Sequence, residues 1–225
     1  MNILNFCENS NKKLDFNTKN FVSLGMKKRN ITMNVDKTKK LFVDKFYTPA
    51  YQDWRVDKIK AGKDIVGEKY EDFREEYYKS MGFKLGNGKK IFGTSYNCDT
   101  VAKIGDVIVI LEEDKANYVD SCFLGRALQN AAQVFNACLK KGIEIPYFVI
   151  SSSTRYNKYK VLYDEKVETF REDLVEILNE KFVYLPLCEH DRRVKGYFET
   201  PDNCFELSDK LIEKQNKFVS SILNG

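Results

Sequence analysis

The stretch CDTVAKIGDVIVILEEDK, from Cys98 to Lys115, constrains the fold more than any other part of the chain. Residues 99–104 form a short strand candidate, and Gly105-Asp106 is a turn dipeptide. Val107–Leu111 is a run of five apolar residues, mostly β-branched, which favours a strand buried on both faces. The sequence therefore predicts a β-hairpin folded about Gly105.

The second strand of this hairpin ends in four charged residues, Glu112-Glu113-Asp114-Lys115. The hairpin brings Asp99 back opposite Glu112 or Glu113. Because side chains alternate along a strand, Glu113 and Lys115 share one face, and Glu112 and Asp114 share the other. Two carboxylates and a lysine are thus expected to converge at the end of a buried strand, and Glu112 with Asp114 is an alternative pair. The charged end also fits a strand that simply enters a solvated turn.

A set of two carboxylates and one lysine suits metal-dependent hydrolysis. Mg²⁺ takes oxygen ligands, usually one or two carboxylates together with phosphate oxygens and water. A bound metal lowers the pKa of a water and neutralises charge on a phosphoryl group. A lysine two residues after a ligand orients the attacking water or stabilises negative charge. Asp99, Glu113 and Lys115 are therefore candidates for such a site.

Composition limits the class of protein. A chain of 225 residues, 43% hydrophobic and 31% charged, is expected to form one soluble domain, 1–225. We expect no membrane span, no secretion signal and no nucleotide cofactor, since the sequence shows none of their patterns. Six scattered cysteines and a single histidine argue against a zinc site and favour a cytoplasmic location. Residues 1–45 carry ten Lys or Arg against four Asp or Glu, which predicts a basic N-terminal arm.

Periodicity predicts the elements around the hairpin. Residues 66–81 and 120–141 have helical apolar stripes, and Gly82 and Gly142 end them. Residues 145–150 read as a buried strand after a short loop. A strand, a helix and a further strand of these lengths form a parallel crossover inside a mixed sheet. The expected fold is α/β (α+β), with a central mixed β-sheet flanked by helices.

Further elements are expected on both sides of this core. Residues 37–45 open a helix or a short strand, and residues 90–96 form a strand. Residues 169–180 read as a helix and residues 182–187 as a strand. A final amphipathic helix spans 205–223, with its inward residues expected to be Leu207, Leu211, Phe218 and Ile222.

Several polar residues are candidates for supporting roles. Glu76 lies on the flank of the first helical stripe, from which it would offer another carboxylate, and Gln129 or Gln133 would face the site from the second helix. Hydroxyl and guanidinium groups suit contacts with phosphates and base edges. The candidate DNA contacts are Ser151, Ser152, Ser153 and Arg155 in a polar loop after residue 150, and Arg192 and Arg193 after residue 187.

The predicted elements are a helix, a hairpin with an acid at its start and a second strand ending in E-x-K, a further helix and a further strand. This order resembles the core of the PD-(D/E)XK nuclease superfamily. The resemblance covers residues 66–150, and residues 151–225 would complete the strands and helices. It implies a restriction-endonuclease-like core in which Asp99 and Glu113 bind Mg²⁺ and Lys115 assists the attacking water. The residue before Asp99 is Cys98, where the family pattern has proline.

A single-domain chain of this size is most similar to a type II restriction endonuclease. That similarity implies Mg²⁺-dependent, site-specific cleavage of double-stranded DNA by a homodimer. A repair or junction-resolving nuclease of the same superfamily and an inactive DNA-binding module of the same fold are alternatives. An unrelated α/β protein with a solvated hairpin end is a further one.

Overall fold

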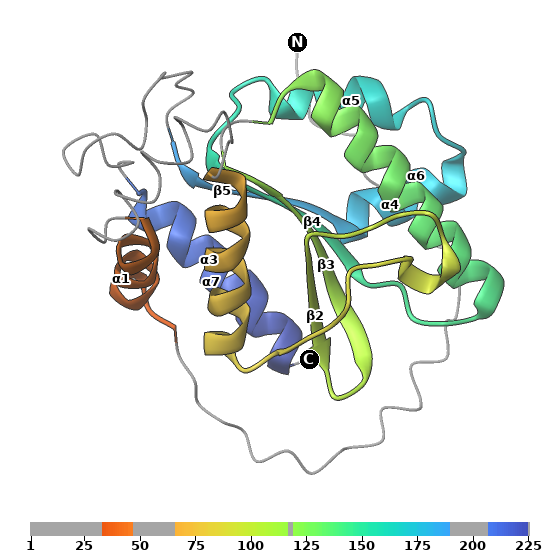
Figure 1. Cartoon of the computed structure of the whole chain (residues 1–225). Coiled ribbons are helices and arrows are strands. Elements are labelled where there is room, and N and C mark those ends of the chain that lie inside the picture. Colours follow the sequence, from red (N-terminus) through yellow and green to blue (C-terminus); the bar gives the residue numbers. More distant parts are fainter. Residues whose placement is uncertain (1–32, 47–65, 117–118, 190–206, 225) are drawn as a thin grey trace, which may run out of the picture. The chain divides into compact units, whose positions relative to one another are not determined.

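The computed structural model describes residues 33–46, 66–116, 119–189 and 207–224 (Figure 1). All of them belong to one compact unit of the chain. None of the helices in these ranges has the length and apolar character needed to cross a membrane. Arg192 and Arg193 lie outside the described residues, as does most of the predicted basic arm.

Five strands of the described residues form one mixed sheet, in the spatial order β1-β2-β3-β4-β5. The pairs β1–β2 and β2–β3 are antiparallel, whereas the pairs β3–β4 and β4–β5 are parallel. The predicted α/β fold with a central mixed sheet is therefore confirmed. The strands are β1 (Lys84–Leu85), β2 (Thr100–Ile104), β3 (Val107–Lys115), β4 (Tyr147–Thr154) and β5 (Phe182–Cys188).

Helices cover both faces of the sheet (Figure 1). On one face lie α1 (Val35–Phe46), α3 (Val66–Met81) and α7 (Asp209–Asn224). On the other lie α4 (Ser121–Lys141), α5 (Tyr159–Val167) and α6 (Glu172–Lys181). The part of the predicted basic arm that the structure describes therefore lies mainly in helix α1. Phe42 of α1 is buried against Phe73 of α3, at a ring-centroid distance of 5.1 Å.

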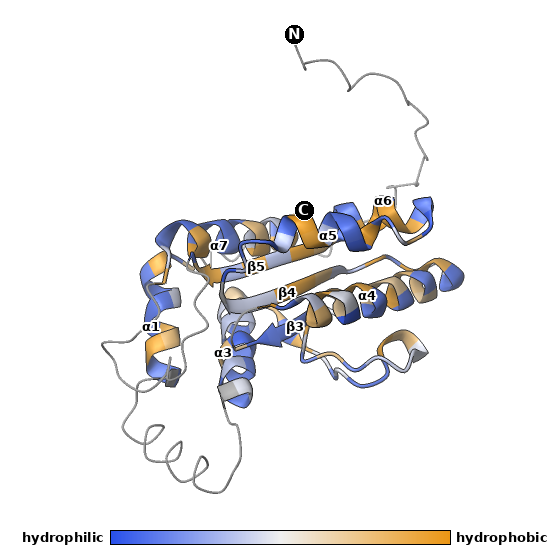
Figure 2. Ribbon diagram, turned by 90° about the horizontal axis from the view of Figure 1, so that it is seen from above, coloured by the Kyte–Doolittle hydropathy of each residue, from blue (hydrophilic) through white to orange (hydrophobic). Residues whose placement is uncertain are grey.

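Helix α4 shows how the sequence sets the boundaries of the crossover. Asp120 is the N-cap, and its carboxylate accepts a hydrogen bond from the amide of Phe123 at 2.7 Å. Gly142 ends the helix at φ 61°, a left-handed conformation that favours glycine. Figure 2 shows hydrophobic and hydrophilic residues sharing this helix, as expected for one that packs with one face on a sheet. Both predicted ends are confirmed.

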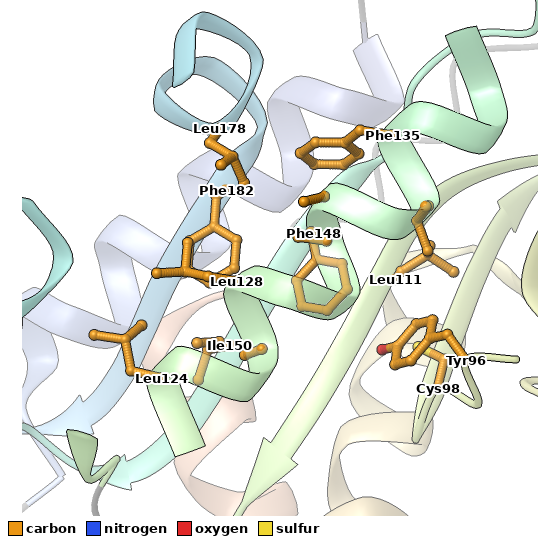
Figure 3. Packing of buried hydrophobic residues seen from close by; sticks show 14 of the residues in the cluster. Tyr96, Cys98, Leu111, Leu124, Leu128, Phe135, Phe148, Ile150, Leu178 and Phe182 are labelled. Carbon is orange, nitrogen blue, oxygen red and sulfur yellow. The ribbon is translucent and has the colours of Figure 1, made fainter. Parts of the chain in front are cut away.

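The core between α4 and the sheet is rich in aromatic and branched residues. Phe148 of β4 stacks on Phe182 of β5 at 5.5 Å, and its other aromatic neighbour is Tyr96, at 5.6 Å. Leu111 of β3 and Leu128 of α4 are fully buried in the same cluster (Figure 3). This packing fixes β3 and β4 side by side, and with them the charged end of β3.

The central hairpin contains a β-bulge. Ala102 pairs with Ile110, but Lys103 pairs with Ile108, so Val109 is an extra residue on β3. The bulged strand is not buried along its whole apolar run: Val107 is 51% exposed, whereas Ile110 and Leu111 are fully buried. The prediction of burial on both faces holds only for the half of the run next to the charged residues.

Three further predictions differ from the structure. Residues 90–96 contain a short 3-10 turn, η1 (Ile91–Gly93), instead of a strand, since Lys90 and Phe92 have positive φ. Strand β4 continues to Thr154, so the predicted polar loop begins later. In α7 the most deeply buried side chains are Ile212, Gln215, Asn216 and Val219. The four predicted inward residues are only partly buried.

Candidate active site

The start of β2 and the end of β3 meet at one end of the hairpin. Thr100 pairs with Glu112, which places Asp99 one step further, on the side of Glu113. The carboxylate of Asp99 accepts a hydrogen bond from the backbone amide of Asp114 at 2.9 Å. The structure thus brings Asp99 to the charged end of β3.

Glu113 and Lys115 share the face of β3 that points toward α4. The amide of Asn130 on α4 donates to Glu113 at 3.5 Å. The ammonium of Lys115 lies 5.3 Å from the ring centroid of Phe123, also on α4. Asp99, Glu113 and Lys115 are therefore gathered in the way the hairpin pattern predicts.

The two carboxylates on this face are poorly compensated. Partial burial raises the pKa of Asp99, and the Asp114 amide and the cations Lys115 and Arg126 do not cancel the rise. Burial also raises the pKa of Glu113, and the nearby charge of Asp99 raises it further. Both acids therefore ionise less readily than in water, first because they are partly buried and then because another carboxylate lies close by, Glu112 for Asp99 and Asp99 for Glu113.

Helix α3 brings a third carboxylate, Glu71, to the same region. Burial raises its pKa to about 7, and the charge of Asp99 is the next largest cause. The apolar stripe of this helix predicts Glu76 in this role instead. Five residues turn an α-helix by about 140° beyond one full turn, so Glu76 lies on a different side of α3. The side of α3 that packs on the sheet is set by Tyr70, Tyr77 and other buried residues.

Helix α4 contributes different residues from those predicted. Arg126 lowers the pKa of Asp99 and of Glu113, which places its positive charge beside the site. Gln129 is exposed, and the amide of Gln133 donates to the hydroxyl of Ser95 at 3.2 Å. The residues of α4 that face the site are thus Arg126 and Asn130, which are four positions apart. Both belong to the same series of polar residues along this helix as Gln129 and Gln133.

The opposite face of β3 carries a buried ion pair. The guanidinium of Arg74 on α3 donates to both carboxylate oxygens of Glu112, at 2.6 and 2.9 Å. Tyr78 donates to Glu112 at 2.6 Å, and Thr100 donates to Asp114 at 2.8 Å. Figure 2 shows this hydrophilic end of β3 beside α3. The alternative pair Glu112 and Asp114 is therefore enclosed by the protein.

A close backbone approach holds the segment before Asp99. The amide of Cys98 donates to the carbonyl of Gly88 at 2.8 Å. A Cβ atom at position 88 would lie 2.0 Å from the carbonyl oxygen of Cys98, so only glycine fits there. The thiol of Cys98 donates to the carbonyls of Thr100 and Glu112, which ties the two strands together.

The predicted DNA contacts divide into two groups. Ser151, Ser152 and Ser153 are fully buried in β4 and hydrogen-bonded to Tyr70, Tyr184 and the carbonyl of Ala116, respectively. Their burial and hydrogen bonds give these serines a structural role in β4, and the burial does not favour the predicted contact with DNA. Arg155 is exposed just after β4, and its role stays a prediction.

The donor set matches a hard divalent cation in chemistry. Asp99 and Glu113 supply two carboxylates, and Glu71 adds a third whose pKa responds to Asp99. Mg²⁺ is commonly held by one or two carboxylates, with water and phosphate oxygens completing the shell. Within the described ranges, no group of three or more His, Cys, Asp or Glu side chains is arranged to hold a metal ion. Any metal bound here would therefore have few ligands from the protein, with water or phosphate oxygens completing its shell.

Comparisons with known proteins add no relatives. No protein-family model matches the chain, and neither a curated protein nor a solved structure does.

Proposed function

We propose that this protein is a Mg²⁺-dependent endonuclease that hydrolyses phosphodiester bonds of double-stranded DNA. The observation that carries the proposal is the convergence of Asp99, Glu113 and Lys115 on one face at the charged end of β3. Those residues combine hard oxygen ligands with a cation two residues further along the same strand. The proposed site is at the end of β3 that leads into the α4 crossover, where β3 pairs in parallel with β4.

Each residue has a distinct part in the proposed reaction. Asp99 and Glu113 would hold the metal, which when bound supplies an acidified water and positive charge for the phosphate. Lys115 would hold the attacking water and stabilise negative charge on the phosphate oxygens. Arg126, whose charge already acts on both acids, would contact a neighbouring phosphate. Glu71 on α3 would add negative charge beside the site without ligating the metal.

The order of the described elements also supports the proposal. A helix, an antiparallel hairpin, a crossover helix and a parallel strand are the elements on which the resemblance to PD-(D/E)XK nucleases rests. We extend the proposal to a cytoplasmic homodimer that cuts at a specific site, as in a type II restriction endonuclease. A two-fold dimer would match a palindromic site.

Cleavage of plasmid and phage DNA by the purified protein tests the proposal. We expect discrete fragments with Mg²⁺ and none with EDTA. Glu113→Ala should abolish cleavage and leave the protein folded, whereas Glu176→Ala, an exposed site on α6, should cleave normally. Cleavage by Glu113→Ala at the wild-type rate would contradict the assignment. Nicked or smeared products would favour a repair-type nuclease, and DNA binding without cleavage would favour the inactive module.

A further inference from the structure

Arg74 is the largest of the fully buried side chains that the structure describes. Its guanidinium contacts Glu112 through two nitrogens, and the rings of Tyr77 and Tyr78 lie 4.7 and 5.3 Å from its central carbon. A two-point contact with a carboxylate fixes direction as well as distance. The ion pair therefore holds one residue of β3 in a defined orientation against α3.

Asp114, two residues further along the same face, is held as well. The hydroxyl of Thr100 donates to its carboxylate at 2.8 Å, and the Nε of Arg74 lies 4.0 Å from its other oxygen. The amide of Asp114 is in turn the donor to Asp99. A single residue thus connects the buried network to Asp99, the candidate metal ligand just before β2.

Because side chains alternate along a strand, these contacts also fix where the side chains on the other face of β3 point. When residues 112 and 114 are held toward α3, residues 113 and 115 must point toward α4. Thr100, which holds Asp114, is also the residue next to Asp99. The network therefore contacts the sequence neighbours of all three residues of the proposed site.

We propose that Arg74 is a positioning residue of this site, which acts through Glu112 and Asp114 to hold Glu113, Lys115 and Asp99 in place. The inference rests on the proposed function. Stability alone does not call for this network, because apolar side chains of similar volume often stabilise a core as well as a buried ion pair does. The effect of the network that matters for the site is that it fixes the position of the β3 backbone.

Two variants and one control test this role. Arg74→Lys keeps the positive charge but loses the two-point contact, and Tyr78→Phe removes only the hydroxyl that donates to Glu112. Leu174→Ala opens a buried position on α6, outside the network, and controls for lost stability. Mn²⁺ is the probe of the metal site, with its affinity measured by calorimetry below the unfolding temperature of each variant.

We expect Arg74→Lys to weaken Mn²⁺ binding by about tenfold or more, the usual effect of losing a group that orients metal ligands. Tyr78→Phe should weaken it less, and Leu174→Ala should leave it unchanged. The maximal cleavage rate should fall with Mn²⁺ affinity, while KM for DNA changes little. Wild-type Mn²⁺ affinity in both network variants would overturn the inference, and Tyr78→Phe decides the matter if Arg74→Lys does not fold.

Hydrogen exchange of the Asp114 amide separates this inference from the proposed function. The measurement needs no metal and no DNA. If wild-type protein neither binds Mn²⁺ nor cleaves DNA, the proposed function fails. Faster exchange at Asp114 in Arg74→Lys than in Leu174→Ala would still support the positioning contact, and equal exchange would overturn it.

Discussion

The two faces of β3 at its charged end differ in how their acids are compensated. Toward α3, Glu112 is enclosed with a guanidinium and a tyrosine hydroxyl, and Asp114 accepts from a threonine. Toward α4, Glu113 has one long hydrogen bond from Asn130, and Tyr96 and Arg126 also lower its pKa, but burial and the charge of Asp99 outweigh them. The α4 face is thus under-neutralised, whereas on the α3 face only Glu112 has a close cation partner. Burial and the charge of Glu112 raise the pKa of Asp114 well above its ordinary value, and one of its oxygens accepts no hydrogen bond.

This difference separates structural acids from candidate functional ones. A buried carboxylate that stabilises a fold is normally paired and hydrogen-bonded, as Glu112 is. At a partly open site, burial and neighbouring carboxylates together raise pKa values: burial and then the charge of Glu112 raise the pKa of Asp99, and burial and then the charge of Asp99 raise the pKa of Glu113. A divalent cation would relieve that repulsion. The comparison predicts opposite responses of the two faces to mutation, metal and pH.

Mutation of the two neighbouring glutamates should give the largest contrast. Glu112→Ala leaves the buried charge of Arg74 with only the 4.0 Å contact to Asp114, and breaking a buried ion pair in this way costs about 3–5 kcal/mol of unfolding free energy. For a domain of this size, Tm would fall by roughly 10 °C or more. Glu113→Ala should change the free energy by less than about 1 kcal/mol. Thermal unfolding followed by circular dichroism measures both, and equal losses would break the comparison.

Metal should stabilise the protein through the under-neutralised face only. A ligand at about one hundred times its Kd adds about 2.7 kcal/mol to the stability of the state that binds it. We expect Mg²⁺ to raise the Tm of wild-type protein by roughly 5–10 °C at that concentration. Asp99→Asn should show no such shift, and NaCl at matched ionic strength controls for screening. An equal Mg²⁺ shift in both proteins would place the ion elsewhere.

The smallest expected effect concerns Glu71 and pH. Its pKa of about 7 in the folded protein exceeds the ordinary value of 4.5, so protonation favours the folded state. The resulting stability is complete below pH 4.5 and is lost as the pH rises through about 7. Glu71→Gln, which imitates the protonated form, should match wild type at pH 4.5 and exceed its Tm at pH 8. Since solvent screens this half-exposed group, we expect about 2 °C at most.

A control variant makes the pH measurement specific. Glu176→Gln changes an exposed glutamate on α6 and should behave like wild type at both pH values. A Tm difference for Glu71→Gln that stays constant between pH 4.5 and pH 8 would show that burial and Asp99 do not act on Glu71 as described.

The sequence was sufficient for the framework of the fold. Local signals set α4, since Asp120 caps its start and Gly142 permits its left-handed end. The spacing of Tyr70, Phe73, Tyr77 and Met81 set α3, whose bounds match the prediction. The hairpin followed from a turn dipeptide between two strand-forming runs. Each of these features depends on residues that are close in sequence.

Features that depend on distant partners could not be predicted. The burial of Arg74 could not be predicted, because a charged residue is expected at the surface. A pattern of apolar residues does not identify an arginine whose partner, Glu112, lies 38 residues away. Ser151 to Ser153 have the composition of a loop, yet hydrogen bonds to Tyr70, Tyr184 and the carbonyl of Ala116 make their burial possible. Glu71 was missed for the same reason, because the rotation of α3 is fixed by what it packs against.

The β-bulge at Val109 separates the two halves of β3. Its extra residue means that the alternation of side chains at the tip of the hairpin is out of step with the alternation at the charged end. A change of tip length by one residue is therefore expected to be absorbed at the bulge, while β4 keeps residues 110–115 in register. The hairpin tip can thus vary in length and composition without exchanging the inside and outside of the candidate site.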